Sequence, residues 1–289
     1  MSAIDEVDCF QDAQTIMDSF VRVTKPLLDG RLSKLPEDLY CSVYAIDWCC
    51  KETSSSIVML LKHGKLWDAQ ILLRTVINAT AKMCYLLSGS AKDRAKRTKE
   101  YVELATKKDF GSMEQPLDGL FAMGAYGTGD RLRFAEREFK EKAAKLKTQI
   151  GEGAAVREAA NHLDYLSLTR ILENEFWYWK EVRKFLDFEY SAANKVVHVN
   201  YTGCCEVMQR IAKIQNNTYG MVEDQATLSH ILFVVCVLYR VRSEIVFQIS
   251  GEDPAEMRKI LVKDNPFVRY SQEMCDKASD RLPGAVGQV

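Results

Sequence analysis

Apolar residues recur every three or four positions through most of the chain, which is the spacing of one face of an α-helix. One such stripe runs through residues 36–63 and a second runs through residues 66–87. Pro36 suits the first turn of a helix, where its missing N–H would have no partner, and Gly64 suits a helix end. The spacing therefore predicts two long helices joined by a very short link, which is an antiparallel helical hairpin.

The same periodicity predicts helices along the rest of the chain. Ser90 and Asp93 have the spacing of a capping box and mark a helix start. Further helices are predicted at 130–149, at 167–200 with an optional kink near Asp187, at 222–249 and, as one or two helices, at 255–277. The sequence contains no solenoid repeat and no alternating run that requires a sheet.

These elements predict an all-α fold, a multi-helix bundle built around the central antiparallel hairpin. With only 6 prolines and 15 glycines, the composition favours long helices over a turn-rich β fold. We expect a single helical domain at 1–283, followed by a disordered tail at 284–289. The highly charged helix at 130–149 either projects from this body or lies across it.

Charge and hydropathy narrow the classes of function. Lys and Arg total 39 against 40 for Asp and Glu, so the overall charge does not argue for a nucleic-acid or membrane protein. The most apolar stretch, 228–239, is shorter than the ~20 residues of a membrane span, and the N-terminus lacks a signal-peptide pattern. We expect a cytoplasmic protein that does not enter a membrane. The nine cysteines have no zinc-site spacing, so we predict reduced thiols, no metal and no cofactor.

One polar constellation could form a site. Tyr190, Asn194 and His198 are spaced at i, i+4 and i+8, so they share one helix face that continues an apolar stripe. Buried polar groups need partners, and Arg74 and Asn78 on the second hairpin helix could supply them. Three interpretations remain open: a polar core network that fixes helix register, a ligand-binding or catalytic site, or residues that never meet.

Three motifs carry a resemblance to a known family. They are LLxHGxxxDAxxLLRTxxN at 60–78, FWYWxxxR at 176–183 and YxxxNxxxH at 190–198. Over residues 40–200 the chain resembles a bacterial all-helical family of unknown function. Members of that family carry Arg-Ser/Thr-x-x-Glu and Tyr-x-x-x-Ser-x-x-x-His, whereas this chain has Asn78 in place of Glu and Asn194 in place of Ser. The family is reminiscent of HEPN-type bundles, some of which are RNases of toxin–antitoxin and phage-defence systems.

The resemblance makes a metal-independent ribonuclease one hypothesis. His198 would act as general acid and base and Arg74 would hold the phosphate. The HEPN motif places an Arg four to six residues before its His, whereas here that window contains Asn194 and Lys195, and Arg183 is farther away. Arg74 would therefore have to approach His198 through the fold.

The remaining features concern partners. Two segments, 92–108 and 131–147, carry more Lys and Arg than Asp and Glu. They are either solvated helix faces or faces that bind the phosphate backbone of RNA. The aromatic cluster at 176–179 surrounds a helix, so some of its rings would face a second layer or a twin subunit, and we expect a homodimer.

We therefore predict an uncharacterised helical protein of a bacterial defence or stress system. It would bind a protein or RNA partner, or a phosphate-bearing ligand, near Arg74, Tyr190 and His198. The alternatives are the ribonuclease and an adaptor protein with no active site, and whether the protein is an enzyme stays open.

Overall fold

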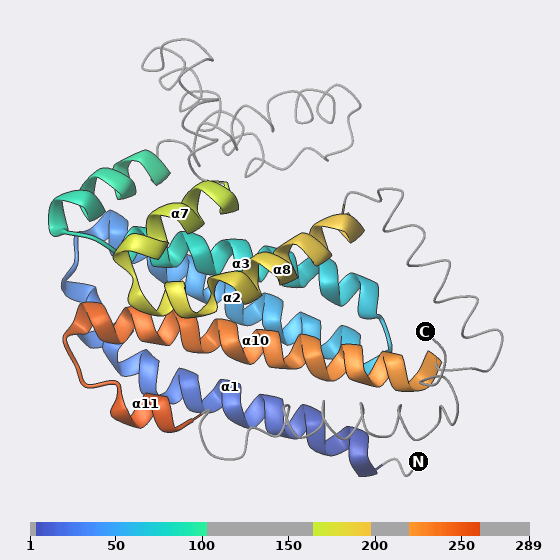
Figure 1. Ribbon diagram of the computed structural model, residues 1–289. Coiled ribbons are helices and arrows are strands. Elements are labelled where there is room, and N and C mark those ends of the chain that lie inside the picture. The colour runs from blue at the N-terminus through green and yellow to red at the C-terminus, as the bar shows by residue number, and fades with distance from the viewer. Residues whose placement is uncertain (1–3, 103–163, 198–219, 261–289) are drawn as a thin grey trace, which may run out of the picture.

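The computed structural model describes residues 4–102, 164–197 and 220–260. These residues are helical and contain no strand, which confirms the predicted all-α class (Figure 1). A further helical stretch covers residues 91–102. The named elements are α1 (Ile4–Gly30), η1 (Leu32–Lys34), α2 (Glu37–Lys62), α3 (Leu66–Leu87), α7 (Tyr165–Glu175), α8 (Trp177–Val197), α10 (Gly220–Ser250) and α11 (Ala255–Lys259). The predicted helix at 130–149, the second basic segment and the predicted tail lie outside the described residues.

The helices α2 and α3 begin and end where the sequence pattern places them. Pro36 immediately precedes α2, and Gly64 takes the left-handed conformation, with φ of +69°, between the two helices. The predicted apolar stripe of α3 is buried along its whole length, at Leu66, Ala69, Leu73, Val76, Thr80, Met83 and Leu87. The helix α3 packs against α2, α7, α8 and α10, so both of its sides are covered.

The long helix predicted at 167–200 is in fact two helices. The chain leaves the helical conformation at Phe176, with φ of −127° and ψ of 103°, and α8 then runs without interruption past Asp187. Phe176 is completely buried, so the break allows its ring to enter the core. Because Tyr165 at the start of α7 stacks on Tyr190 near the end of α8, with ring centroids 4.1 Å apart, the two helices fold back on each other.

The aromatic cluster at 176–179 faces mainly inward. Phe176 and Trp179 are completely buried and Tyr178 is nearly so. Trp177 is 49% exposed, and the Arg258 guanidinium of α11 lies 5.2 Å from its ring centroid. Most of the cluster therefore belongs to the core, and the expectation that some of its rings face outward holds for Trp177.

Cysteines in the described residues are free thiols. Cys9, Cys50, Cys84 and Cys236 are buried, whereas Cys41 and Cys49 are exposed. Burial raises the pKa of the Cys84 and Cys236 thiols above the usual range, so these side chains stay protonated and pack as small apolar groups.

The helix α10 places a charged side chain in the middle of the core. Arg242 is 2% exposed, and its Nε lies 3.4 Å from Asp47 Oδ1 of α2. Its Nη1 donates a hydrogen bond of 3.1 Å to Thr80 Oγ1 of α3. Asp47 also pairs with Lys51 at 2.5 Å. One guanidinium therefore links three helices, and its charge depends on a single buried carboxylate.

Among the described residues, no helix is long and apolar enough to span a membrane.

Replacing Arg242 with Met should lower the free energy of unfolding by about 1.5–3 kcal/mol, because buried Asp47 then keeps only Lys51 as a cationic partner and the contact with Thr80 is lost. The double variant Arg242→Met/Asp47→Leu should recover part of that loss, since neither charge remains. Urea denaturation followed by circular dichroism measures both effects. Arg31→Met, which breaks an exposed ion pair with Glu252, is the control and should cost less than about 1 kcal/mol. A similarly small loss for Arg242→Met would contradict this account.

Candidate functional site

Arg74 and Tyr190 meet between α3 and α8. Arg74 Nη2 donates a hydrogen bond of 3.3 Å to the Tyr190 hydroxyl, and its Cζ lies 5.3 Å from the Tyr190 ring centroid. The two helices run antiparallel, because Ser88 beyond the end of α3 contacts Glu175 just before α8. Both Arg74 and Tyr190 are half-buried. The structure thus brings together two of the five residues that the sequence singles out.

Asn78 and Asn194 lie one helical turn from this contact, on α3 and α8. The Oδ1 atoms of both side chains are buried and accept no hydrogen bond from any described residue. Arg74 Nε is buried and unpaired in the same sense. Buried polar atoms usually have a partner, because leaving one unpaired costs about 1–3 kcal/mol. Other buried polar atoms in the described core, among them Ser54 Oγ, Trp179 Nε1 and Arg242 Nη2, also lack a partner there. His198 lies outside the described residues, so its approach to Arg74 stays a prediction.

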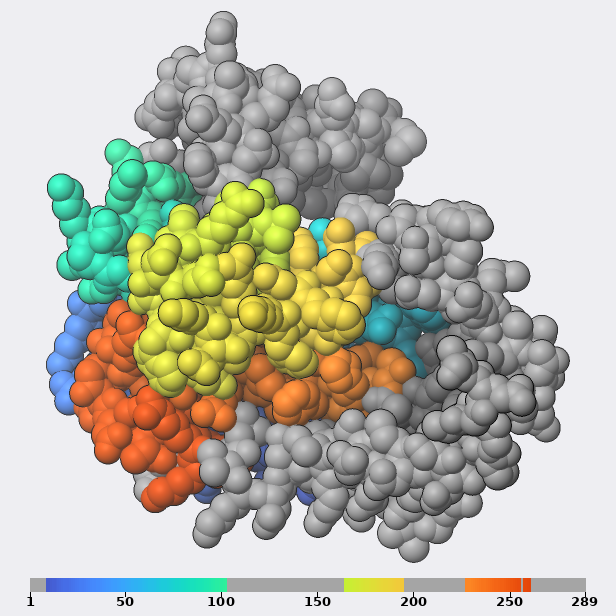
Figure 2. Space-filling model, in the orientation of Figure 1, coloured from blue at the N-terminus to red at the C-terminus, as the bar shows by residue number. Residues whose placement is uncertain are grey.

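The side chains around this place are firmly held. The Tyr165 ring stacks on Tyr190, and burial together with the nearby Asp187 carboxylate raises the pKa of the Tyr165 hydroxyl. Arg183 forms ion pairs with Glu173 and with Asp187, the latter at 3.2 Å. Figure 2 shows that α7 and α8, in yellow, form the surface of the molecule on this side, beside α10 in orange.

The comparisons with known proteins bear on the region that contains this site. The model of DUF5677, a family of unknown function, matches residues 50–210, which is more than half of the chain. The chain belongs to the DUF5677 family. Comparison with curated proteins and with solved structures gives no match. The match confirms the resemblance to an uncharacterised family and carries no information on HEPN-type bundles. The DUF5677 region includes all five predicted site residues, whereas α1 and α10 lie outside it.

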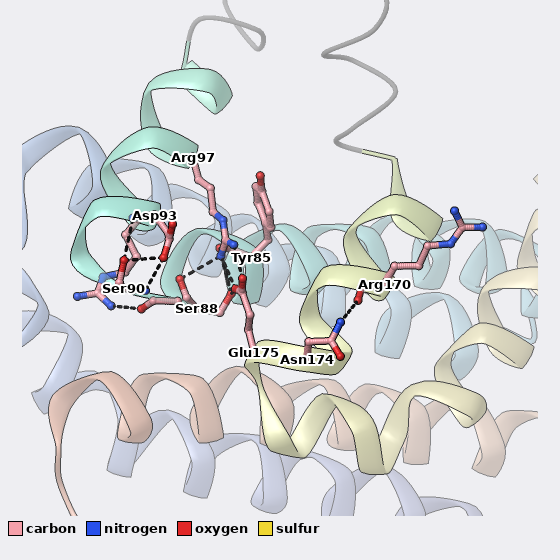
Figure 3. Close-up of polar contacts among 10 residues, drawn as sticks. Tyr85, Ser88, Ser90, Asp93, Arg97, Arg170, Asn174 and Glu175 are labelled. Carbon is pink, nitrogen blue, oxygen red and sulfur yellow. Dashed lines mark hydrogen bonds and ion pairs between the residues drawn. The ribbon is translucent and has the colours of Figure 1, made fainter.

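A second polar cluster in the DUF5677 region is internally satisfied (Figure 3). Arg97 forms a two-pronged ion pair with Glu175 of α7, with N–O distances of 2.6 and 2.7 Å. The same guanidinium donates to the backbone oxygens of Tyr85 and Ser88, both at 3.1 Å. Because a charge of each sign is present and the donors have acceptors, this cluster joins α3, α7 and the helix at 91–102. We assign it a structural role.

The sequence analysis does not find the pairing of Arg97 with Glu175. These residues are far apart in the chain, and no local pattern relates them. The sequence does indicate the helix start beside them. The Ser90 N–H donates to Asp93 Oδ2 at 3.0 Å and the Asp93 N–H donates to Ser90 Oγ at 3.2 Å, which confirms the capping box.

His230 of α10 is another residue for which the sequence suggests no partner. Its Nε2 lies 2.8 Å from Glu189 Oε1 of α8, and its ring meets Phe185 edge to face. The Glu189 side chain is buried. The hydrogen bond to this carboxylate raises the pKa of His230, so protonation of the imidazole strengthens the contact between α8 and α10.

This contact predicts a pH dependence. The folded-state pKa of His230 is raised, so its stabilising effect is complete below the unfolded pKa of about 6.5 and disappears as pH rises through the folded pKa. The stability difference between wild type and His230→Gln should therefore shrink from about pH 5.5 to about pH 8.5. An NMR titration of His230 should give a midpoint above the ordinary value, and Glu189→Gln should lower it. An unchanged midpoint in Glu189→Gln would refute the role of that carboxylate.

Proposed function

We propose that this protein binds a phosphate-bearing ligand of the nucleotide class between α3 and α8, at Arg74 and Tyr190. One observation carries the proposal. Arg74 is a half-buried cation that pairs with no carboxylate among the described residues, where its guanidinium donates to the Tyr190 hydroxyl and lies over the Tyr190 ring. An anionic ligand group would supply the missing charge.

Other shielded arginines in the described part of the chain show what a structural role requires. Arg97 pairs with Glu175, Arg183 pairs with Glu173 and Asp187, and Arg242 lies beside Asp47. In each case the guanidinium is partly removed from water and a carboxylate lies against it, which offsets the cost of desolvation. Arg74 differs from all three, and phosphate is the ligand group whose geometry a guanidinium matches best after carboxylate.

The neighbouring amides add a requirement for hydrogen-bond donors. The buried Oδ1 atoms of Asn78 and Asn194 are acceptors, and phosphate oxygens cannot satisfy them. Ribose hydroxyls and base amino groups can donate to such oxygens. A ligand with a phosphate for Arg74 and donors within one helical turn on either side fits this combination better than a bare anion.

The assignment to a bacterial defence or stress system is supported by the resemblance to HEPN-type bundles alone. A metal-independent ribonuclease would use the same Arg74, with His198 as the proton carrier. In an adaptor protein, these polar residues would only fix the register of α3 against α8. Both are outcomes that the following experiment separates.

Isothermal titration calorimetry should detect binding of ATP, or of a short 5′-phosphorylated oligoribonucleotide, to the wild-type protein in EDTA. Arg74→Met should weaken that binding about 10- to 100-fold, because a charge-assisted hydrogen bond contributes about 1.5–3 kcal/mol. The removal of the Asn78 acceptor in Asn78→Leu should weaken binding less. Incubated RNA is analysed in parallel for cleavage by wild type and by His198→Ala.

Arg240→Met is the matched control, since Arg240 of α10 is also half-buried and already lies beside a carboxylate, that of Glu244. It should bind as wild type does, after circular dichroism confirms its fold. Binding that Arg74→Met leaves intact, or no binding of either probe, would refute the proposal and favour the adaptor. Cleavage that disappears in His198→Ala would add ribonuclease chemistry to the same site.

A further inference from the structure

The outward side of α2 has the composition of an interface and no partner among the residues that the structure describes. Exposed residues recur on this side at Tyr44, Trp48, Glu52, Ser55, Met59 and Lys62, and we call them the outer face of α2. Trp48 is 56% exposed and Met59 is 63% exposed. Every residue of α2 is described, and between Leu39 and Leu61 the one exposed charged residue is Glu52.

Such a face is unusual for a helix that remains in water. Exposed helix faces normally carry many charges, whereas the centres of protein interfaces are poor in charge and rich in aromatic residues and methionine. The serine of the outer face fits burial as well. Ser55 donates its hydroxyl to the backbone carbonyl of Lys51, at 3.1 Å, so covering it leaves no donor unpaired.

We infer that the occupant of this face is the outer face of α2 from a second copy of the chain, packed antiparallel about a two-fold axis. The charge at the two ends of the helix supports this orientation. Glu37 and Asp38 lie in the first turn, while Lys62 ends the helix and Lys65 follows it. In an antiparallel pair the acidic end of each copy meets the basic end of the other, whereas a parallel pair would bring like charges together.

Side-chain sizes select a register for this pair. With the axis between residues 51 and 52, Trp48 of each copy lies opposite Ser55, whose small side chain leaves room for the indole. Tyr44 then lies opposite Met59, a favourable pairing of an aromatic ring with a thioether. The two copies of Glu52 lie beside the axis. The face is thus complementary to itself in side-chain size along its length and in charge at its two ends, and this inference does not depend on the ligand site.

Sedimentation velocity across a concentration series tests the dimer. Wild type should sediment as a dimer at about 10 µM, and Trp48→Glu should weaken association at least 100-fold, because it places a charge in the centre of the contact. Phe188→Glu, on α8 and 69% exposed, is the matched control and should remain dimeric. If Trp48→Glu does not fold, Ser55→Arg replaces it, since Ser55 is exposed in the single chain.

A cross-link tests the register. In a Cys41→Ser/Cys49→Ser background, Glu52→Cys should form an intermolecular disulfide under mild oxidation, because the two copies of residue 52 lie beside the axis. Lys62→Cys should not, since its two copies would be separated by about 31 Å along the helices. A monomeric wild type at about 100 µM, a dimeric Trp48→Glu, or cross-linking by Lys62→Cys in place of Glu52→Cys would each overturn the proposal.

Discussion

The arrangement of the helices depends on a buried charge that has few partners. Arg242 lies in the core, and its contacts with Asp47 and Thr80 fix the position of α10 along α2 and α3. A buried guanidinium is tolerated only where a carboxylate offsets the loss of hydration, so α10 cannot slide along α2 without separating the two charges. Apolar packing alone would permit several registers between long helices, whereas this pair selects one of them.

The position of α3 follows from that constraint, and α3 carries the candidate site. One side of α3 packs on α2 and α10 through small and aliphatic side chains, which leaves Arg74 and Asn78 directed toward α8. The hairpin of α7 and α8 is fixed separately, by the ion pair between Arg97 and Glu175. Two ionic contacts, Arg242 with Asp47 and Arg97 with Glu175, therefore hold in place the two helices that carry Arg74 and Tyr190.

Local signals in the sequence predict the helices well and predict long-range pairings poorly. Pro36 and Gly64 mark the ends of α2 because their backbone preferences act within one residue. The i, i+4 spacing of Tyr190 and Asn194 correctly places them on a face toward the interior. The break at Phe176 was missed, since the helical spacing continues through it and the gain from burying its ring depends on the assembled core. Helix α1 was not assigned, although it packs along α10, and Pro26 lies within it.

The site itself was only partly predictable for the same reason. Periodicity indicates which face of a helix a residue occupies, but it does not indicate which helix lies opposite. Arg74 and Tyr190 could be suspected as partners because both are polar residues on faces that otherwise read as buried. No such clue relates His230 to Glu189 or Arg97 to Glu175. The two residues of each pair lie on different helices, and only the fold determines that those helices are neighbours.

The two surfaces that lack partners in the described chain lie on different sides of α3. The helix α2 packs on one side of α3 and α8 packs on another (Figure 1). The outer face of α2 is exposed, and Arg74 of α3 contacts Tyr190 of α8. A contact between two copies through α2 would therefore not involve the contact between Arg74 and Tyr190 in either copy. The dimer would carry two ligand sites that face away from the two-fold axis, each built from a single chain. It follows that ligand affinity and association are separable properties, because α3 lies between the residues that govern them.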